Sequence, residues 1–157
     1  IAAPRDGVGI VDADGCPLWR LLQAGFGPPE LNIARPTSGV QLVHRPESGG
    51  GGQLLASDIE IADSFLQQAR GLMFRRSLAD DAALVFQFDS AAKRDVHMLF
   101  VPFAIDALWL VDDEVVATKR LKPWIGLGRE PAETLVELPA GAAADVAVGD
   151  RVTLESS

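Results

Sequence analysis

The chain of 157 residues is poor in metal-binding and redox side chains, with one cysteine, Cys16, and two histidines, His44 and His97. One cysteine excludes an intramolecular disulfide, and three such side chains are too few for cysteine-based zinc or iron–sulfur sites. We therefore predict no bound metal and no other cofactor. A lone cysteine is more often a small apolar residue than a nucleophile, and we interpret Cys16 in that way.

Basic residues are also scarce, since 14 lysines and arginines stand against 22 acidic residues and leave a net charge of −8. Such a surplus of negative charge repels nucleic-acid phosphates, so we expect no nucleic acid partner. Only three of the bases are lysines, and aspartate outnumbers glutamate fourteen to eight. This balance suits a halophilic protein kept soluble in concentrated salt, although codon bias alone would give the same composition.

Long hydrophobic runs are missing as well, because no segment approaches the roughly twenty apolar residues that span a bilayer. The start of the sequence, IAAPRDGVGIVDADG, has neither the basic end nor the apolar run of a signal peptide. We expect a cytoplasmic protein with no membrane partner. The oligomeric state is left open.

Residues 1–38 are rich in glycine and proline and show no sustained hydrophobic period, so we interpret them as an extension. From residue 39 onward, apolar and polar residues alternate as in β-strands, and we predict one β domain over residues 39–157. Strands are predicted over residues 40–44, 54–62, 83–88, 95–101, 104–111, 114–121, 133–138 and 151–155.

One short helix interrupts this pattern, over about residues 63–71. Ser64 and Gln67 have capping-box spacing, and Gly71 is suited to the left-handed position that ends a helix. Turn residues separate the strands, including DSAAKR at 89–94 and a long loop at 122–132. Short strands at this spacing with one helix predict a mainly β fold, a compact antiparallel sandwich or barrel.

Four ordered motifs carry a family resemblance: ARGLMFRR with ALVFQF, then HMLFVPFAIDALWLVDDEVV, then LVELPAG, then VGD. In this order they resemble the domain of unknown function 192 family over about residues 54–155. The resemblance implies a jelly-roll-like β domain with a helix near its start, and no secure activity. Many members carry Trp-Met-Lys-Asn where this chain has residues 97–100, so any role of that lysine and asparagine is absent here or taken over by His97.

The segment HMLFVPFAID carries His97 and Asp106 at the ends of eight uncharged residues. If the chain reverses tightly at Val101 and Pro102, the two side chains face each other with Cβ atoms about 5 Å apart. Asp106 would then orient His97 as a general base. A bulge or an open bend sends them apart, and backbone groups at the strand ends would satisfy both.

Three arginines, Arg70, Arg75 and Arg76, surround the expected end of the helix. Their guanidinium groups could form an anion clamp, although Arg70 is also explained by the negative end of the helix dipole. In the family pattern a glutamate precedes the PAG turn, which makes Glu137 a candidate with Arg70 or Arg75 as its partner. The alternative places Glu137 outward in solvent.

The loop at 122–132 carries Trp124, and large apolar groups in such a loop either fold back onto the barrel mouth or form a contact surface. Met98, next to His97, is a further candidate. The candidate catalytic residues are therefore His97 and Asp106, and the candidate ligand-binding residues are Arg70, Arg75, Met98, Trp124 and Glu137.

Two functions from different classes remain. We prefer a binding module whose open end holds a small, anionic ligand or a peptide segment. The alternative is a hydrolase- or isomerase-like enzyme with His97 as general base, Asp106 as its orienter and Arg75 as anion anchor. No serine, threonine or cysteine lies in a recognisable nucleophile elbow beside His97, so whether the chain is an enzyme is left open. A domain that only mediates protein contacts is the third possibility.

Overall fold

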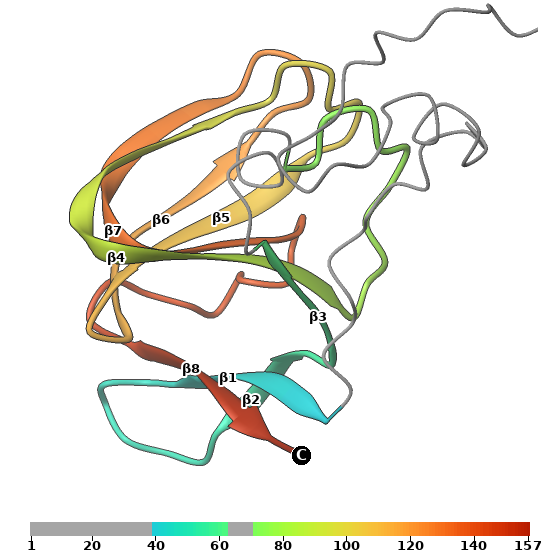
Figure 1. The fold of residues 1–157 in the computed structure, drawn as a ribbon. Helices are drawn as coiled ribbons and strands as arrows, with labels where there is room; N and C mark the ends of the chain where they lie inside the picture. Colours follow the sequence, from blue (N-terminus) through green and yellow to red (C-terminus); the bar gives the residue numbers. More distant parts are fainter. Residues whose placement is uncertain (1–38, 63–70) are drawn as a thin grey trace, which may run out of the picture. The chain divides into compact units, whose positions relative to one another are not determined.

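The computed structural model describes residues 39–62 and 71–157, which all belong to one compact unit of the chain. Eight strands make up most of it: β1 (Val40–Arg45), β2 (Gln53–Ala56), β3 (Asp58–Ala62), β4 (Ala82–His97), β5 (Ile105–Val111), β6 (Glu114–Leu121), β7 (Leu127–Pro139) and β8 (Arg151–Ser156). They form one sheet in the order β2-β1-β8-β6-β5-β7-β4-β3, shown in Figure 1. The mainly β prediction is confirmed, whereas the sandwich or barrel form is not.

All neighbouring strands are antiparallel except β3 and β4, which are parallel. The sequence had suggested one strand over residues 54–62, but the chain breaks at Ser57 into β2 and β3. The backbone N–H groups of Ser57 and Asp58 both donate to the carbonyl oxygen of Asp81, at 2.9 and 3.0 Å. This anchor lets β2 pair with β1 while β3 pairs with β4.

The prediction of a turn at residues 89–94 is wrong, because this segment lies in the long strand β4. The prediction of a loop at 122–132 is wrong for residues 127–132, which lie in the long strand β7. The two strands pair on both sides of a shift in register, where residues 88–91 of β4 stand opposite the single residue Glu133 of β7. Figure 1 shows both strands turning back on themselves in this part of the sheet. Polar residues are tolerated there because the bend exposes them, and in the sequence they resemble a turn.

The predicted helix falls on residues 63–70, which lie outside the described residues, and on Gly71. Gly71 has a φ of 46°, the left-handed conformation expected for it. The described part of the chain contains no α-helix, and therefore no helix that could cross a bilayer.

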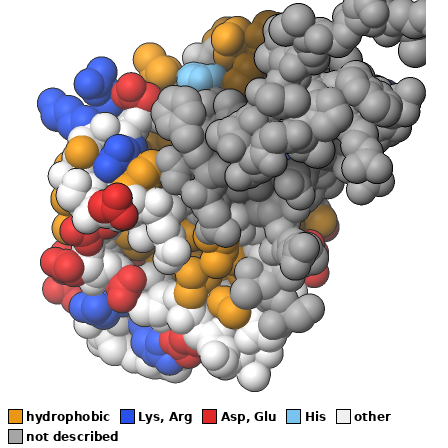
Figure 2. All heavy atoms as spheres, in the orientation of Figure 1, with side chains coloured by type: hydrophobic (Ala, Val, Ile, Leu, Met, Phe, Trp, Pro, Cys, Tyr) orange, Lys and Arg blue, Asp and Glu red, His pale blue; other side chains and the backbone are white. Residues whose placement is uncertain are grey.

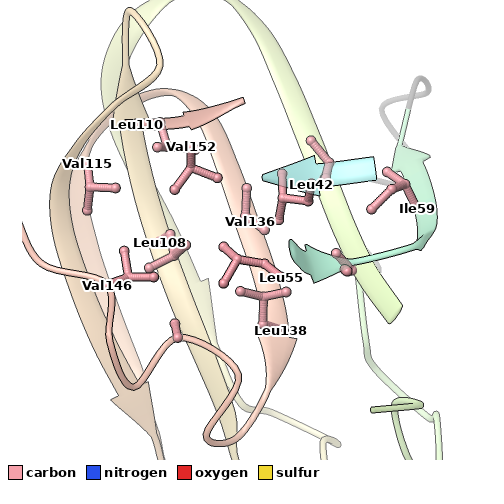
Figure 3. Close-up of a cluster of buried hydrophobic side chains, with 14 residues drawn as sticks. Leu42, Leu55, Ile59, Leu108, Leu110, Val115, Val136, Leu138, Val146 and Val152 are labelled. Carbon is pink, nitrogen blue, oxygen red and sulfur yellow. The ribbon is translucent and has the colours of Figure 1, made fainter. Parts of the chain in front are cut away.

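The central strands are buried on both faces. Leu108 of β5 points into a first hydrophobic cluster, drawn in Figure 3 with Val136 of β7 beside it. Its neighbours Ala107 and Trp109 point the other way, into a second cluster that contains Leu135. Successive side chains of a strand alternate between faces, so each cluster takes every other residue. The candidate site described next lies on the face of the second cluster.

Candidate functional site

A cavity of about 320 Å³ lies on the second-cluster face, where β4 bends. Residues from both halves of β4 line it, with Phe86 and Phe88 before the bend and Arg94 and Val96 after it. The bend therefore wraps the strand around the cavity. The remaining lining consists mainly of apolar side chains: Leu72, Met73, Met98, Val101, Ile105 and Leu135.

Glu137 of β7 lies among these apolar groups with only 6% of its surface exposed. Its neighbours across the sheet are Leu84 on β4 and Ala107 on β5, and neither offers a hydrogen bond from its side chain. Burial raises the pKa of Glu137 to about 8, and the attraction of Arg75 only partly opposes this rise. Its Oε2 has no hydrogen-bond partner among the described residues. A carboxyl group is thus held in its neutral form at physiological pH.

Arg75, the expected partner of Glu137, is bound elsewhere. Its two terminal nitrogens donate to the carboxylate of Glu60 on β3, at 2.7 and 2.8 Å. This bidentate contact occupies the guanidinium N–H groups that an anion clamp would require. The structure therefore gives no support to Arg75 as an anion anchor, and Arg75 acts on Glu137 only through space.

Arg94 brings the complementary charge to the cavity. Its guanidinium carbon lies 3.8 Å from the centre of the Phe88 ring, and one terminal nitrogen donates to the carbonyl oxygen of Ser90 at 3.0 Å. Its backbone carbonyl accepts a hydrogen bond from the indole nitrogen of Trp109 at 3.0 Å. The Nε of Arg94 is buried and has no partner within the described residues. Arg94 and Glu137 therefore line the same cavity, and each has one buried polar atom without a partner in the described residues.

The rim of the cavity carries further charges from the second half of β4. Lys93, Asp95 and His97 all line it and all are exposed. Asp95 has an arginine partner outside the cavity, Arg129 of β7, at 3.3 Å. Because Asp95 is paired, Lys93 and Arg94 give the cavity a net positive charge, which favours an anionic ligand.

The predicted pairing of His97 with Asp106 is wrong. His97 stands opposite Leu127 on β7, and Asp106 stands opposite Arg120 on β6, so the two residues do not share a strand pair. The chain does not reverse at Val101 and Pro102, because residues 98–104 separate β4 from β5 and the hydrogen-bonded turn in them runs from Met98 to Val101. This was the alternative in which a bend sends the two side chains apart.

Asp106 instead has a structural environment. Burial disfavours its ionised form, but hydrogen bonds from Arg120 and from the backbone N–H groups of Gly141 and Ala143 outweigh this effect and lower its pKa. The Arg120 contacts measure 2.7 and 3.2 Å, and the backbone contacts 2.8 and 3.1 Å. Asp106 therefore ties the loop after β7 to the sheet, as expected of a carboxylate satisfied at a strand end.

The other candidate residues are divided between the cavity and the surface. Met98 is buried and lines the cavity, whereas Trp124 is exposed and is not part of its lining. Arg70 lies outside the described residues. The structure thus brings together His97, Met98 and Glu137, and it adds Arg94, which sequence reasoning missed because its segment was interpreted as a turn.

A second polar pair was also missed. The Nε2 of His44, on β1, lies 2.7 Å from a carboxylate oxygen of Asp150, and both residues are buried. Asp150 also accepts hydrogen bonds from the N–H groups of Ala147 and Glu47, each at 2.9 Å. These backbone bonds and the His44 contact lower the pKa of Asp150 to about 2. The only sequence signal was the Gly149–Asp150 turn, which predicts a hairpin rather than a histidine partner.

The profile of the domain of unknown function 192 family, described as "Uncharacterized ACR", matches residues 47–154. The chain belongs to this family. The resemblance found in the sequence motifs is thereby confirmed. A UPF0127 protein of Pyrococcus furiosus is 35% identical over 105 residues, which are 64% of this chain and 90% of that relative.

Two solved structures share the fold of this family member. A candidate transcription regulator from Sinorhizobium meliloti gives a TM-score of 0.62 at 23% identity, covering 73% of this chain and 92% of the other. A protein of unknown function from Novosphingobium aromaticivorans gives 0.60 at 23% identity, covering 72% of this chain and 83% of the other. At this identity the likeness establishes the fold alone.

Proposed function

We propose that this protein is a binding module for a small organic anion with an apolar body, held in the cavity between Arg94 and Glu137. One observation supports this most strongly: the Nε of Arg94 and the Oε2 of Glu137 are both buried without a hydrogen-bond partner among residues 39–62 and 71–157, and both residues line the same cavity. Buried polar groups are nearly always hydrogen-bonded, and an unpaired one is costly. A ligand that pairs with both removes that cost.

The chemistry of the two groups defines the ligand. The guanidinium of Arg94 donates and attracts a negative group such as a carboxylate. The carboxyl of Glu137 is protonated below about pH 8, so it can donate to a hydroxyl or carbonyl oxygen of the same molecule. The apolar side chains between them suit a hydrocarbon portion. A volume of about 320 Å³ is on the scale of a small-molecule pocket rather than a peptide groove.

Calorimetric titration with matched ligand pairs tests this proposal. Hydroxy- and keto-carboxylic acids with short apolar bodies are compared with their primary amides, which keep the shape but lose the negative charge. We expect the acids to bind and the amides to bind at least about tenfold more weakly, because the charge-assisted contact with Arg94 is lost. Arg94→Met should reduce binding of the acids by a similar factor.

Arg151→Gln is the matched control, because Arg151 is an exposed arginine on β8 that does not line the cavity, and its contacts Asp112 and Asp113 lie outside the lining as well. It should leave the affinity for the acids unchanged. If acids and amides bind equally to the folded wild-type protein, or if Arg94→Met binds the acids as well as wild type does, the proposed site is wrong.

A second candidate function is proton-transfer catalysis on such a ligand. A carboxyl whose pKa is raised to about 8 by burial can both give and take a proton near neutral pH. Glu137, and not the pair first expected at His97 and Asp106, would be the acid–base group. An isomerase-type reaction needs no nucleophile, whereas a hydrolase needs a nucleophilic side chain or an activated water.

Deuterium exchange measured by NMR distinguishes the two candidate functions. A proton-transfer enzyme should exchange a carbon-bound hydrogen next to the carbonyl of a bound keto acid for solvent deuterium, and Glu137→Gln should abolish the exchange while the ligand still binds. Binding without any exchange in the wild-type protein would leave the binding module alone.

A further inference from the structure

Two neighbouring loops carry most of the exposed hydrophobic surface. Eight large hydrophobic side chains are exposed among the described residues, and five of them lie in or beside the β4–β5 and β6–β7 connections. Ile125 is the most exposed, at 79%. We name these five residues the apolar tip: Leu99, Phe100, Trp124, Ile125 and Leu127. Figure 2 shows hydrophobic and basic side chains near a histidine at the upper edge of the face in view.

The apolar tip is one surface because the two loops are joined through their backbones. The N–H of Met98 donates to the carbonyl oxygen of Gly126 at 2.9 Å, and the N–H of Trp124 donates to that of Val101 at 3.0 Å. A Cβ on Gly126 would lie 2.6 Å from the Cγ of Met98, so only glycine permits this close approach. The tip is therefore a fixed surface rather than a flexible lid.

The conformation of the tip is unfavourable for its residues. Phe100 and Trp124 adopt left-handed backbone angles, with φ of 59° and 66°. Bulky side chains rarely occupy this region, and such outliers gather at binding sites. The Phe100 ring stacks on the Phe74 ring, with centroids 4.9 Å apart, whereas the Trp124 side chain is held toward solvent, where burial does not compensate for the strain.

The charges around the tip differ in sign from those of the whole chain. Residues 119–129 (KRLKPWIGLGR) contain four bases and no acid, in a chain with a net charge of −8. Two of these bases, Arg120 and Arg129, are paired with Asp106 and Asp95, so Lys119 and Lys122 carry the remaining positive charge. Lys119 donates from its Nζ to the carbonyl oxygen of Leu127 at 2.8 Å, which places an ammonium group directly at the tip. Lys122 is exposed beside it. The tip is therefore apolar at its centre and basic at its edge.

We propose that the apolar tip docks this protein on the surface of an anionic lipid membrane. Tryptophan and aliphatic side chains enter the headgroup region, and nearby lysines are attracted to negatively charged lipids. Trp124 and Ile125 would insert, and Lys119 and Lys122 would contact the lipid phosphates. This proposal departs from the expectation of no membrane partner. That expectation was based on the lack of a membrane-spanning apolar segment, and docking of this kind does not require one.

A second copy of the chain suits the tip less well. A two-fold contact centred on the tip would bring the Lys119 and Lys122 groups of both copies together, and like charges across an interface oppose association. The lipid surface instead supplies the opposite charge. This proposal is independent of the cavity and its ligand.

Vesicle co-sedimentation of the full chain at low salt tests the docking. Vesicles containing phosphatidylglycerol should bind the wild-type protein, and vesicles of phosphatidylcholine alone should bind it at least about tenfold more weakly. Replacing both Trp124→Ser and Ile125→Ser should reduce the bound fraction on anionic vesicles at least about tenfold, because the inserting groups are lost. Lys122→Glu should weaken binding only to the anionic vesicles.

Leu54→Ser with Val148→Ser is the matched control, since both are exposed apolar residues outside the tip, and it should bind like wild type. Circular dichroism confirms that each variant is folded. Equal binding to both vesicle types, or none to either, would overturn the proposal. It would also be overturned by a wild-type dimer, seen in sedimentation velocity, that the tip variant converts to a monomer without any binding to vesicles.

Discussion

Two buried carboxyl groups on adjacent central strands, Asp106 of β5 and Glu137 of β7, have opposite environments. Asp106 is 3% exposed and Glu137 is 6% exposed, so burial alone does not distinguish them. Asp106 accepts hydrogen bonds from Arg120 and from two backbone N–H groups, and its pKa is lowered. Glu137 keeps one oxygen without a partner in the described residues, and its pKa is raised.

The contrast shows that hydrogen-bond partners can offset the effect of burial on an acid, as they do for Asp106 and do not for Glu137. Asp106 is ionised and fully used in holding the loop after β7, so it has no remaining capacity for a ligand. Glu137 is neutral at physiological pH and faces a cavity, so it costs stability in the empty protein and gains a partner when a ligand binds. The following predictions test this difference.

The largest effect is expected for Asp106→Ala. The change leaves the N–H groups of Gly141 and Ala143 unpaired and removes the partner of Arg120, so we expect a loss of about 3 to 5 kcal/mol in the free energy of unfolding. Urea unfolding at pH 7 measures it. Asp89→Asn is the control, because Asp89 is exposed, and its effect should stay within about 0.5 kcal/mol.

Glu137→Gln should stabilise the protein at pH 8, by roughly 1 to 4 kcal/mol. In the unfolded chain the carboxyl loses its proton near pH 4.5, whereas the folded protein keeps it until about pH 8. The unfolded state therefore binds fewer protons over this range, and wild-type stability falls as the pH rises. Glutamine cannot ionise, so the variant lacks this fall.

Urea unfolding of wild type and Glu137→Gln at intervals from pH 4 to pH 9 measures the difference. The variant should gain on the wild type across this range and the gain should level off above about pH 8. A difference that is constant with pH would mean that Glu137 is ionised in the folded protein, and the comparison with Asp106 would fail.

A smaller effect is expected for Asp150→Asn, about 1 to 2 kcal/mol at neutral pH, through weaker hydrogen bonds to His44, Ala147 and Glu47. The pKa of Asp150 is lowered to about 2, so its contribution is present above about pH 4 and is lost as the pH falls toward 2. Acid titration of stability should therefore show the wild type and the variant converging below pH 4. Parallel curves would contradict the assigned role of Asp150.

The smallest effect is expected for Arg120→Gln, below that of Asp150→Asn, because this arginine is more than half exposed and its ion pair is screened by solvent. The backbone hydrogen bonds from Gly141 and Ala143 remain and keep Asp106 satisfied. A loss as large as that of Asp106→Ala, measured by the same unfolding experiment, would show that the guanidinium group rather than the loop backbone holds this carboxylate.

Strand positions were well predicted for β5 and β6, where turn residues separate apolar runs. β5 and β6 match the predicted segments 104–111 and 114–121 to within a residue. The errors fall at the bend, where residues 89–91 are exposed but remain in β4. Local composition indicates a turn there, because it reports exposure and cannot show that β7 continues alongside.

The candidate site was predicted only in part, for a related reason. Glu137 stood out as an acid in an apolar strand, and Met98 and His97 also reach the cavity. Arg94 was not identified, because its place beside Phe88 depends on the bend. The expected pair of His97 and Asp106 failed since it assumed a turn length that the open connection does not have.

The alternation of apolar and polar residues and the order of the family motifs were enough to establish a mainly β member of the domain of unknown function 192 family. Both are local properties, carried by neighbouring residues in the chain. The tertiary structure decided which polar side chains share a site. Arg94 and Glu137 line one cavity, and His44 and Asp150 form one buried pair, because of the strand register and the bulge opposite Glu133. A shift of one residue in register exchanges the faces of a strand, so only the assembled sheet decides which side chains share a site.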